Sequence, residues 1–401
     1  MQTDVAVVGG GLSGLTCAVA LARRGKRVVL ITGGNPMLEQ FSGSIGVLGT
    51  IGGSDVTDDF GKAAKRLDNE HPYRRIGIDR ARAAVPKARE LFSYIGLRMS
   101  GNGKTNHWRL SPLGIVVPAW LSLDGYATLE TPEAWQGKRL ALMTVPGYLD
   151  QAPQLVAHNL QALGTQVTQH RLSLPQLQVT TPTPRPVTLS RKLDGRTALS
   201  SLANDINTAG KDADMVLMPA IMGDDEAALA ALRRRVTVNM MLMPTLPPTT
   251  AGNHLNATLQ HYLKMLGGYV ATSQTVTSAT IDGDRVTSLS TGSGFEVTPQ
   301  RVILATGHLA GGGLKATPVD GVIEPVLGLD VSRPHPDVPE DFATTGVITQ
   351  GDLVPTINGK PLRNVLAIGS LLGGHDAATM HDGEGVDMVT AIHAAELVCS
   401  K

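Results

Sequence analysis

The sequence predicts an α/β protein built on a parallel sheet, which an inserted second domain interrupts. Three observations carry this prediction. The chain opens on a strand, a glycine-rich turn and a helix. Its middle, residues 99–295, changes to short strands with many threonines and prolines, and from residue 301 apolar strands that end in glycines return. Because parallel strands need crossover connections, alternating strands and helices indicate a doubly wound sheet.

The opening unit reads as strand, helix and strand. Residues 4–8 are an apolar run, residues 12–22 have the periodicity of a helix, and residues 26–31 are a second buried strand. The helix ends on two arginines and Gly25, which complement the helix dipole and cap its carboxyl end. A βαβ unit therefore opens the chain.

The turn inside this unit matches the pattern G-x-G-x-x-G at Gly9, Gly11 and Gly14. One glycine permits the tight turn, one lets a phosphate approach the backbone, and one lets the helix pack closely. Helix N-terminal amides then face the anion. We expect a nucleotide or flavin phosphate here, and the alternative is a turn that binds nothing. The expected contact residues are Gly9, Gly10, Gly11, Leu12, Ser13 and Gly14.

The end of the second strand departs from the usual pattern. Dinucleotide-binding proteins carry an acidic residue about 20 residues after the glycines, where it accepts the ribose hydroxyls. Here Thr32 stands at that place, followed by two glycines. The missing carboxylate argues against a fully bound adenosine half and favours FMN, with FAD as the alternative.

A segment of small residues, 41–53, follows the second strand. Glycine lets the backbone approach a ligand closely, so the amides of this segment could hold a flavin ring or phosphate. The expected contacts are Ser42, Gly43 and Ser44. The alternative is a flexible linker.

Two late strands, residues 302–305 and 365–368, each stop at a glycine-containing turn, and a helix follows over about 386–398. This layout resembles two-dinucleotide-binding flavoproteins, in which the late strand and helix hold the flavin ribityl and pyrimidine. The aspartate usual after the strand glycine is replaced by Ser370, so Ser370 or Asp376 is expected to bind a ribityl hydroxyl. The expected contacts of these turns are Thr306, Gly307, Gly369, Ser370, Gly373, Gly374 and Asp376.

The predicted fold class is a Rossmann-like FAD/NAD(P)-binding flavoprotein fold that is discontinuous in sequence. We expect residues 1–98 and 296–401 to form the flavin-binding domain. Residues 99–295 are expected to form an inserted α/β or α+β cap domain for a substrate or a partner. Within the insert, residues 214–244 read as strand, helix and strand, which suits a crossover connection.

The candidate catalytic residues are His375 and His381, and His308 and Asp382 also stand beside glycine-rich turns. A histidine that titrates near neutrality can accept a hydroxyl proton while a hydride leaves to the flavin. Surface loop histidines are the alternative. A further cluster at residues 71–75 either grips a phosphate or is a solvated helix start.

The composition argues against several functional classes. The 35 lysines and arginines balance the 35 aspartates and glutamates, so no net field favours nucleic acid. Cys17 and Cys399 are too few for a disulfide framework, a zinc cage or a cysteine-ligated iron–sulfur cluster, and we expect no metal. No apolar run of membrane-spanning length and no secretory signal is visible, which predicts a cytoplasmic protein.

Several passages together resemble one family, the B subunit of the anaerobic glycerol-3-phosphate dehydrogenase. They are spread from end to end of the chain. Two of them, the proline-rich run and the Glu-Pro-Val-Leu-Gly-Leu-Asp run, are specific because a generic flavoprotein does not require them. The passages are His71-Pro72-Tyr73, Ser111-Pro112-Leu113-Gly114, residues 242–248 (LMPTLPP), residues 324–331 (EPVLGLDV) and residues 366–370 (LAIGS) with Gly373-Gly374.

This resemblance implies an FMN-containing subunit that works beside an FAD-containing catalytic subunit and an iron–sulfur membrane-anchoring subunit. The catalytic subunit would oxidise sn-glycerol 3-phosphate to dihydroxyacetone phosphate, and the electrons would pass to quinone. The implied location is cytoplasmic, with attachment to the inner face of the membrane through the partner subunits.

Two other functions stay open at this point. One is a stand-alone flavin oxidoreductase that acts on a hydroxy or amino substrate beneath the cap, with a histidine as base. The other is a structural subunit that keeps the fold without a cofactor. The intact Gly9, Gly11 and Gly14 favour a bound phosphate, whereas the missing acidic residue keeps the structural alternative open.

Overall fold

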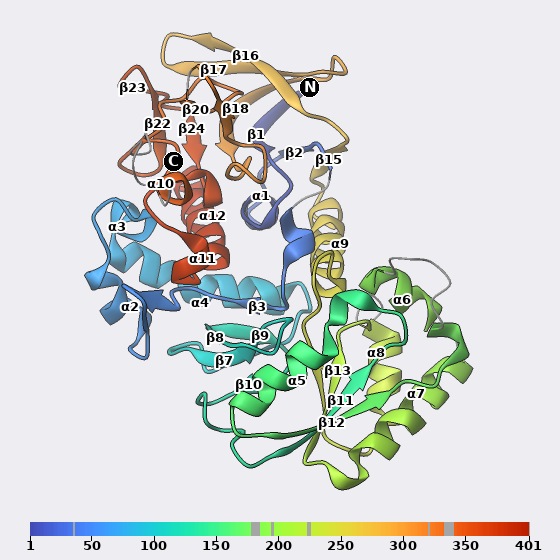
Figure 1. Cartoon of the computed structure of the whole chain (residues 1–401). Coiled ribbons are helices and arrows are strands. Elements are labelled where there is room, and N and C mark those ends of the chain that lie inside the picture. The colour runs from blue at the N-terminus through green and yellow to red at the C-terminus, as the bar shows by residue number, and fades with distance from the viewer. Residues whose placement is uncertain are drawn as a thin grey trace.

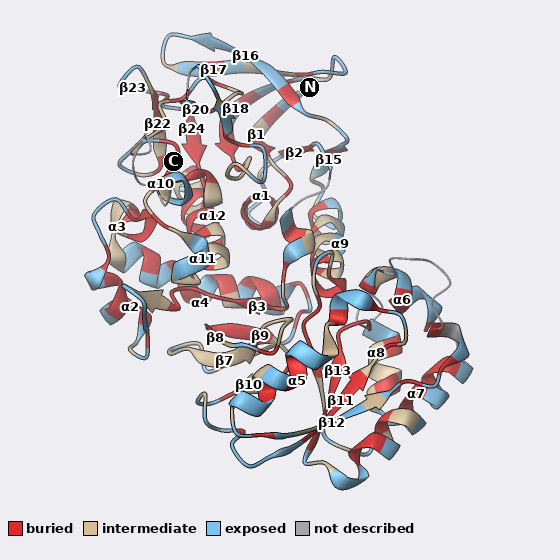
Figure 2. Ribbon diagram, viewed as in Figure 1, coloured by how far each residue is buried: buried red, intermediate tan, exposed pale blue. Residues whose placement is uncertain are grey.

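The structure is a computed structural model that describes residues 1–34, 37–177, 185–193, 196–222, 226–319, 321–332 and 341–400. Figure 1 shows two lobes, and both chain ends belong to the lobe that contains β1 and α12. The other lobe is built from the middle of the chain. Figure 2 shows that the buried residues concentrate in the central strands and the helices beside them, while the β16 hairpin and the outer helix faces are exposed.

The first sheet has the strand order β15-β2-β1-β18-β17-β16, and β24 pairs with β18. Strands β15, β2, β1, β18 and β24 are parallel, whereas β16 and β17 pair antiparallel. The bounds are β1 (Gln2–Val8), β2 (Val28–Thr32), β15 (Tyr269–Thr272), β16 (Val276–Asp282), β17 (Arg285–Thr291), β18 (Glu296–Leu304) and β24 (Val365–Ala367).

The register brings the glycine-rich turns of distant segments together. Val8, the last residue of β1, pairs with Leu304 at the end of β18, and Leu304 pairs with Ala367 at the end of β24. In a doubly wound sheet ligands bind beyond the carboxyl ends of the strands. The turns that follow β1, β18 and β24 therefore meet at one edge of the sheet.

The central position of β1 follows from its sequence. Residues 5–8 are apolar and at most 5% exposed, as expected for a parallel strand covered on both faces. The cover includes α1 (Leu12–Ala22), which is buried along its whole length, and α12 (Gly383–Cys399), which packs against both α1 and α4 (Ile78–Tyr94).

The second sheet has the order β12-β11-β13-β14 and is parallel throughout. The predicted crossover unit is confirmed, because helix α8 connects β13 to β14. Successive residues of β11 face opposite sides: Leu140 and Leu142 share a core with α5, whereas Ala141 and Met143 belong to the larger core that includes α7. The bounds are β11 (Arg139–Thr144), α5 (Pro153–Ala162), β12 (Gln166–Arg171), α7 (Arg196–Ala209), β13 (Met215–Pro219), α8 (Glu226–Arg233) and β14 (Met240–Met243).

Small antiparallel sheets lie between and beside the two lobes. Their orders are β3-β9-β6, β10-β7-β8, β21-β22-β23, β19-β20 and β4-β5. The strands are β3 (Ser44–Ile45), β4 (Thr50–Ile51), β5 (Ser54–Asp55), β6 (Met99–Ser100), β7 (His107–Leu110), β8 (Val116–Ala119), β9 (Leu121–Leu123), β10 (Thr128–Leu129), β19 (Lys315–Thr317), β20 (Gly321–Ile323), β21 (Thr349–Gln350), β22 (Val354–Ile357) and β23 (Lys360–Pro361).

The remaining helices are short, except for α9, whose apolar face packs against α1. They are α2 (Phe60–Ala63), α3 (Pro72–Ile76), α6 (Pro186–Lys192), α9 (Thr250–Met265), α10 (Asp341–Thr344) and α11 (Ala377–Met380), with short 3-10 turns between them. Among the described helices none is both long and apolar enough to cross a bilayer.

The predicted domain boundaries at residues 98/99 and 295/296 stay a prediction. The sheet pairing adds one fact to them, which is that strands β15 to β17 precede residue 296 and still belong to the first sheet. The first sheet therefore already includes β15, which begins at Tyr269.

Candidate flavin-binding site

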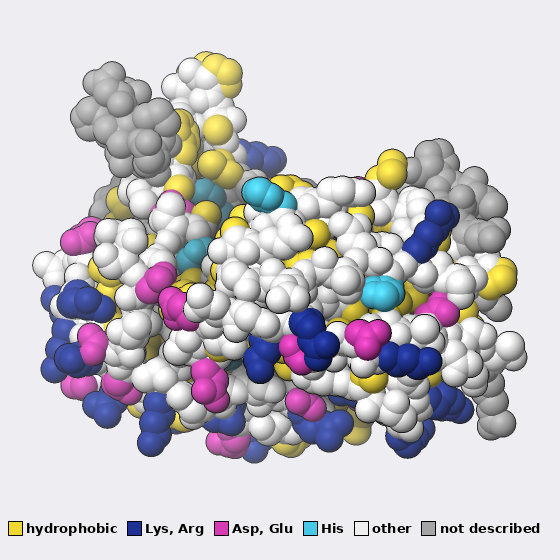
Figure 3. Space-filling model, turned by 60° about the horizontal axis from the view of Figure 1, so that its bottom comes forward, with side chains coloured by type: hydrophobic (Ala, Val, Ile, Leu, Met, Phe, Trp, Pro, Cys, Tyr) yellow, Lys and Arg dark blue, Asp and Glu magenta, His cyan; other side chains and the backbone are white. Residues whose placement is uncertain are grey.

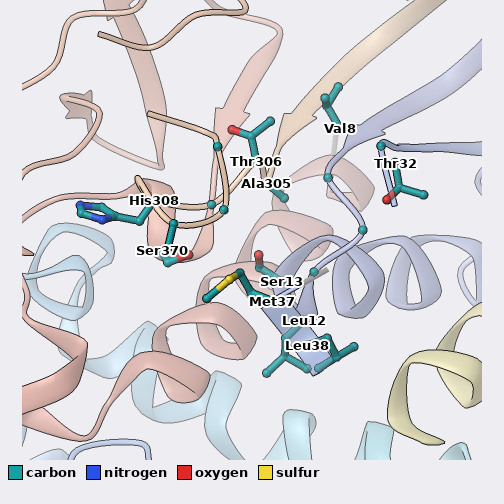
Figure 4. A pocket seen from close by; sticks show the side chains of 18 of the residues that line it. Val8, Leu12, Ser13, Thr32, Met37, Leu38, Ala305, Thr306, His308 and Ser370 are labelled. Carbon is teal, nitrogen blue, oxygen red and sulfur yellow. The ribbon is translucent and has the colours of Figure 1, made fainter. Parts of the chain in front are cut away.

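A cavity of about 730 Å³ lies at the carboxyl edge of the first sheet. This volume is within the range of small-molecule and cofactor sites. Figure 4 shows Val8 from β1, Ala305 and Thr306 after β18, and Ser13 from α1 arranged around it. The cavity is lined by residues 8–13, 31–34, Met37, Leu38, Gln40, Phe41, 274–277, 305–308, 310–312, Lys315, Pro325, Val326, Ser370, Ala377, Gly383, Glu384 and Asp387.

The geometry of the glycine turn agrees with the tight turn and the helix packing that its sequence predicts, and the contact with a phosphate stays a prediction. A Cβ on Gly9, whose φ is +116°, would lie 2.0 Å from the Ala305 carbonyl oxygen. A Cβ on Gly14 would lie 2.0 Å from the Gly9 carbonyl oxygen, so this glycine packs the helix rather than lining the cavity. A Cβ on Gly11 would meet nothing within 4 Å. Gly11 is therefore the position where the cavity reaches the backbone.

One polar group at this edge has no partner. Thr306 lines the cavity, and its buried hydroxyl has no hydrogen-bond partner among the described residues. Such groups cost stability unless they find a partner. Lys315 is the one lysine or arginine among the described lining residues, so a phosphate here would depend mainly on backbone amides and the α1 dipole.

The cavity continues past the end of β2. Thr32 lies there with Gly33 and residues 274–277, and the Gly34 N–H donates to the Thr32 hydroxyl at 3.4 Å. This part of the described lining contains no carboxylate. The cavity thus has room beyond the glycine turn, but its described lining near Thr32 lacks the acidic group that usually binds a ribose.

Part of the predicted cofactor-binding set lines the cavity. Its members are Gly9, Gly10, Gly11, Leu12, Ser13, Thr32, Thr306, Gly307 and Ser370. The other predicted residues lie outside the lining, and these are Gly14, Ser42, Gly43, Ser44, Gly369, Gly373, Gly374 and Asp376. Contact with a cofactor stays a prediction for the whole set.

Local contacts explain why several of these residues lie elsewhere. A Cβ on Gly43 would lie 2.7 Å from the Tyr126 ring, so this glycine serves packing between the lobes. The hydroxyls of Ser44 and Ser122 are hydrogen-bonded to each other at 2.7 Å. Asp376 caps the short helix α11, because its carboxylate accepts the N–H of Ala378 at 3.0 Å.

The first two turns of α12 add two carboxyl groups that sequence reasoning missed. Glu384 and Asp387 both line the cavity, and burial raises the pKa of Glu384 and raises the pKa of Asp387 to about 7. The Ser370 N–H donates to Asp387 Oδ1 at 3.0 Å. A Cβ on Gly369 would lie 2.4 Å from both Asp387 Oδ1 and Ser13 Oγ. Asp387 therefore lies at the end of the late strand, beside Ser370.

The candidate histidines occupy different places. His308 lines the cavity, and its Nε2 donates to the Thr345 carbonyl at 2.9 Å. Burial lowers the pKa of His308 and also that of His381. His381 lies outside the lining, with a left-handed backbone (φ +49°) between α11 and α12. Its carbonyl oxygen would lie 2.1 Å from a Cβ on Gly46, so the glycine segment after β3 holds this turn.

His375 belongs to a buried triad with Asp382 and His71. His375 Nδ1 lies 3.0 Å from Asp382 Oδ1, and His71 Nε2 lies 2.9 Å from Asp382 Oδ2. Burial opposes ionisation of all three groups. The hydrogen bonds and charges of the triad nevertheless raise the pKa of His375 and lower that of Asp382, while the pKa of His71 stays lowered by burial.

The triad decides between the two interpretations of the segment 71–75. His71 is 1% exposed and its Nδ1 accepts the Tyr73 N–H at 3.1 Å, which caps α3. Arg75 pairs with Glu70. The segment is a helix start, as the second interpretation held, but its histidine is buried rather than solvated.

The surface charges agree with the balanced composition. On the face that Figure 3 shows, lysines and arginines alternate with aspartates and glutamates and form no single-sign patch. An extended basic surface is the usual footprint of nucleic-acid binding. This face carries none.

The chain is similar in sequence to known proteins over nearly its whole length. A family model described as an FAD binding domain matches residues 4–386. Over its full length the chain is 35% identical to the B subunit of an anaerobic glycerol-3-phosphate dehydrogenase from Yersinia enterocolitica, of which it covers 99%. It is 30% identical to the protein of the same name from Haemophilus influenzae, and each chain is covered completely.

Among solved structures, the open conformation of a flavocytochrome c3 fumarate reductase aligns with a TM-score of 0.46 at 9% identity, covering 100% of this chain and 78% of that one. The family model and the full-length relatives are sufficient to assign the family. The chain belongs to the FAD binding domain family and, as a flavin-dependent oxidoreductase subunit, to the family of B subunits of anaerobic glycerol-3-phosphate dehydrogenases.

Proposed function

We propose that this chain is the FMN subunit of a quinone-linked anaerobic glycerol-3-phosphate dehydrogenase. The observation that carries the proposal is the cavity at the carboxyl edge of the first sheet, where the backbone at Gly11 opens onto space for a phosphate. The cavity then leads to the N-terminus of α12 through Gly383. A bound flavin supplies the redox chemistry, and the protein supplies position and electrostatics.

The absence of a ribose-binding carboxylate supports FMN, whereas the extent of the cavity supports FAD. Thr32 and the described residues that line the cavity around it provide no carboxylate for a ribose, which supports the mononucleotide. The cavity nevertheless continues to residues 274–277, which supports FAD as the second candidate. The mass of the released flavin decides between them.

We assign the chain a relay role between two partner subunits. An FAD-containing subunit would oxidise sn-glycerol 3-phosphate to dihydroxyacetone phosphate, releasing two electrons and two protons. The electrons would pass through this flavin to an iron–sulfur subunit at the membrane and then to quinone. Cys17 is fully buried and burial raises its pKa, so it is a core residue rather than a cluster ligand. In this arrangement the chain lies on the cytoplasmic side, attached through its partners.

A second candidate function is direct oxidation of a hydroxy substrate by this chain. His308 favours it, because this imidazole lines the cavity and has its Nε2 proton committed to the Thr345 carbonyl. Its Nδ1 is then the basic nitrogen. Because burial lowers the pKa of His308, the base is unprotonated at neutral pH. His375 and His381 stay predicted catalytic residues for this reaction.

The test uses the purified chain under anaerobic conditions. Its visible spectrum is recorded, the flavin is released by heat and identified by mass, and glycerol 3-phosphate is added. The relay proposal expects FMN that stays oxidised until the partner subunits are present. A flavin that glycerol 3-phosphate bleaches directly would overturn the relay in favour of the second candidate, and a colourless protein would overturn both.

A further inference from the structure

Glu324 places a carboxylate in the interior of the protein, next to a wall of the cavity. The residue is 2% exposed and follows β20 directly. It is also the first residue of the 324–331 passage, which a generic flavoprotein does not require. A turn over residues 325–327 comes immediately after it, and the first two residues of that turn line the cavity. The passage therefore joins a buried acid to the candidate site.

The carboxylate is the hydrogen-bond acceptor for the amides of this turn. The Val326 N–H donates to Oε1 at 2.8 Å, and the Leu327 N–H donates to Oε2 at 2.8 Å. The Leu329 N–H donates to the same Oε2 at 3.4 Å. Since both oxygens accept N–H groups, the side chain acts as an ionised carboxylate, although burial raises its pKa. Buried amides need an acceptor, so the turn depends on Glu324.

The turn has one face in the core and one face in the cavity. Leu327 and Leu329 are 7% and 5% exposed and belong to the larger core. Pro325 and Val326 are partly buried and line the cavity. Glu324 itself is not among the described lining residues. Its hydrogen bonds therefore fix where two apolar side chains stand, and its own carboxylate stays behind them.

Asp330, the other acid of the passage, organises a second turn by the same chemistry. Its carboxylate accepts the Thr356 hydroxyl at 2.6 Å, and it accepts the N–H groups of Asn358 and Gly359 at 2.9 and 2.8 Å. None of these four residues belongs to the described lining of the cavity. One passage thus holds two turns through carboxylates, and only the turn held by Glu324 reaches the cavity.

We propose that Glu324 is a positioning residue for the cofactor: by accepting the amides of its turn, it holds Pro325 and Val326 as a preformed apolar wall against which the flavin packs. This inference rests on the proposed function, because it requires a flavin in the cavity. A preformed wall strengthens binding, since the protein does not have to order these groups when the ligand arrives.

Glu324→Gln and Asp330→Asn are a matched pair of variants. Each replaces one carboxylate oxygen by an NH₂ group, so each turn loses an acceptor, and urea unfolding of the apoprotein is expected to show a lower stability for both. The apoproteins are then titrated with the flavin that the wild type binds, following flavin fluorescence. Glu324→Gln is expected to bind about tenfold more weakly than wild type, and Asp330→Asn within about twofold of it. Wild-type affinity in Glu324→Gln, or equal weakening in the two variants, overturns the inference.

A double-mutant cycle tests whether Glu324 acts through the wall. Pro325→Ala combined with Val326→Ala removes the wall side chains and leaves the amide of residue 326 in place for the carboxylate. This wall variant is expected to bind flavin about tenfold more weakly than wild type. Adding Glu324→Gln to it is expected to weaken binding by no more than about a further twofold, because the wall is already gone. A combined loss of about a hundredfold would show two independent effects and overturn the inference.

Hydrogen exchange of the wild-type chain tests the preformed wall without any substitution, so the test stays decisive if a variant does not fold. In the apoprotein the amides of residues 326, 327 and 329 are expected to exchange at least about a hundredfold more slowly than in an unstructured chain. Exchange at unstructured rates until flavin is added would show that the flavin orders the turn, and this overturns the inference. All of these contrary results leave the proposed function standing, whereas a wild-type chain that binds no flavin overturns both.

Discussion

The two parallel sheets of this molecule differ at the same place, the carboxyl edge. In the first sheet glycine-containing turns follow β1, β18 and β24, and at Gly11 the backbone opens onto the cavity. In the second sheet the strands end in apolar side chains: Val145 follows β11, and Ala220 and Ile221 follow β13, all at most 5% exposed. Doubly wound topology offers a site at such an edge. The residues after the strands decide whether side chains or a ligand fill it.

The largest effect, on flavin binding, is expected when an apolar side chain is placed at the carboxyl edge of the first sheet, as at the edge of the second. Gly11→Val places a branched side chain in the space that the backbone leaves for a phosphate, while φ at this residue is negative and suits valine. We expect flavin binding to be abolished, measured as flavin content after purification, with a thermal melt near that of the wild-type apoprotein. Gly292→Val, an exposed glycine whose φ is also compatible with valine, serves as control and should keep its flavin. Unchanged flavin content in Gly11→Val would move the phosphate site elsewhere.

A substitution in the second sheet is expected to change the free energy of unfolding and to leave the flavin content unchanged. Leu142 is fully buried in the core between β11 and α5. Leu142→Ala is expected to lower the free energy of unfolding by about 3 kcal/mol, the usual cost of such a cavity. The measurement is urea unfolding, with Leu149→Ala, at a position 77% exposed, as control. Loss of flavin from the folded Leu142→Ala protein would show that the two edges depend on each other.

The parts of the site that lie within local sequence patterns were predictable, and the parts that depend on distant pairing were not. The turn at Gly9 to Gly14 and the strand end at Thr306 were predictable because each lies within a local pattern of strand, glycine and helix. Asp387 was not, because it stands inside an apolar helix. Only the pairing of β24 with β18, which brings α12 to the cavity, gives its carboxyl group a place there.

His71 was equally beyond local reasoning. It is 311 residues from Asp382 in sequence, and its neighbours in the chain are two arginines and a tyrosine that suggest a phosphate grip. What fixes its role is burial, since a buried carboxylate requires hydrogen-bond partners from whichever segments the fold brings near. A single sequence contains the residue types of such a cluster without their distances.

The pH dependence of the apoprotein's free energy of unfolding tests the raised pKa of Asp387, the carboxyl group that the sequence did not predict. Burial raises the pKa of Asp387 to about 7 from its usual value near 3.8. Between pH 4 and 7 the folded apoprotein therefore binds more protons than the unfolded chain, so its free energy of unfolding falls as the pH rises through this window and levels off above it. Asp387→Asn removes this loss. Urea unfolding at pH 5 and pH 8 should show wild type losing about 1–2 kcal/mol more than the variant, and parallel losses would contradict the raised pKa.

The smallest effect is expected at Asp376, where the sequence predicted a ligand and the fold provides a helix cap. Its carboxylate accepts the Ala378 N–H and the Thr379 hydroxyl, and the residue stays outside the cavity lining. Asp376→Ala is expected to lower the free energy of unfolding by about 1 kcal/mol, as loss of an N-cap does, and to leave flavin affinity within twofold. Asp376→Asn, which keeps an oxygen acceptor, should recover most of that stability. If Asp376→Ala weakened flavin binding tenfold while Asp376→Asn kept the affinity, the ribityl contact would belong to Asp376 after all, and the cavity would extend by one residue beyond Ala377, the lining residue at the start of α11.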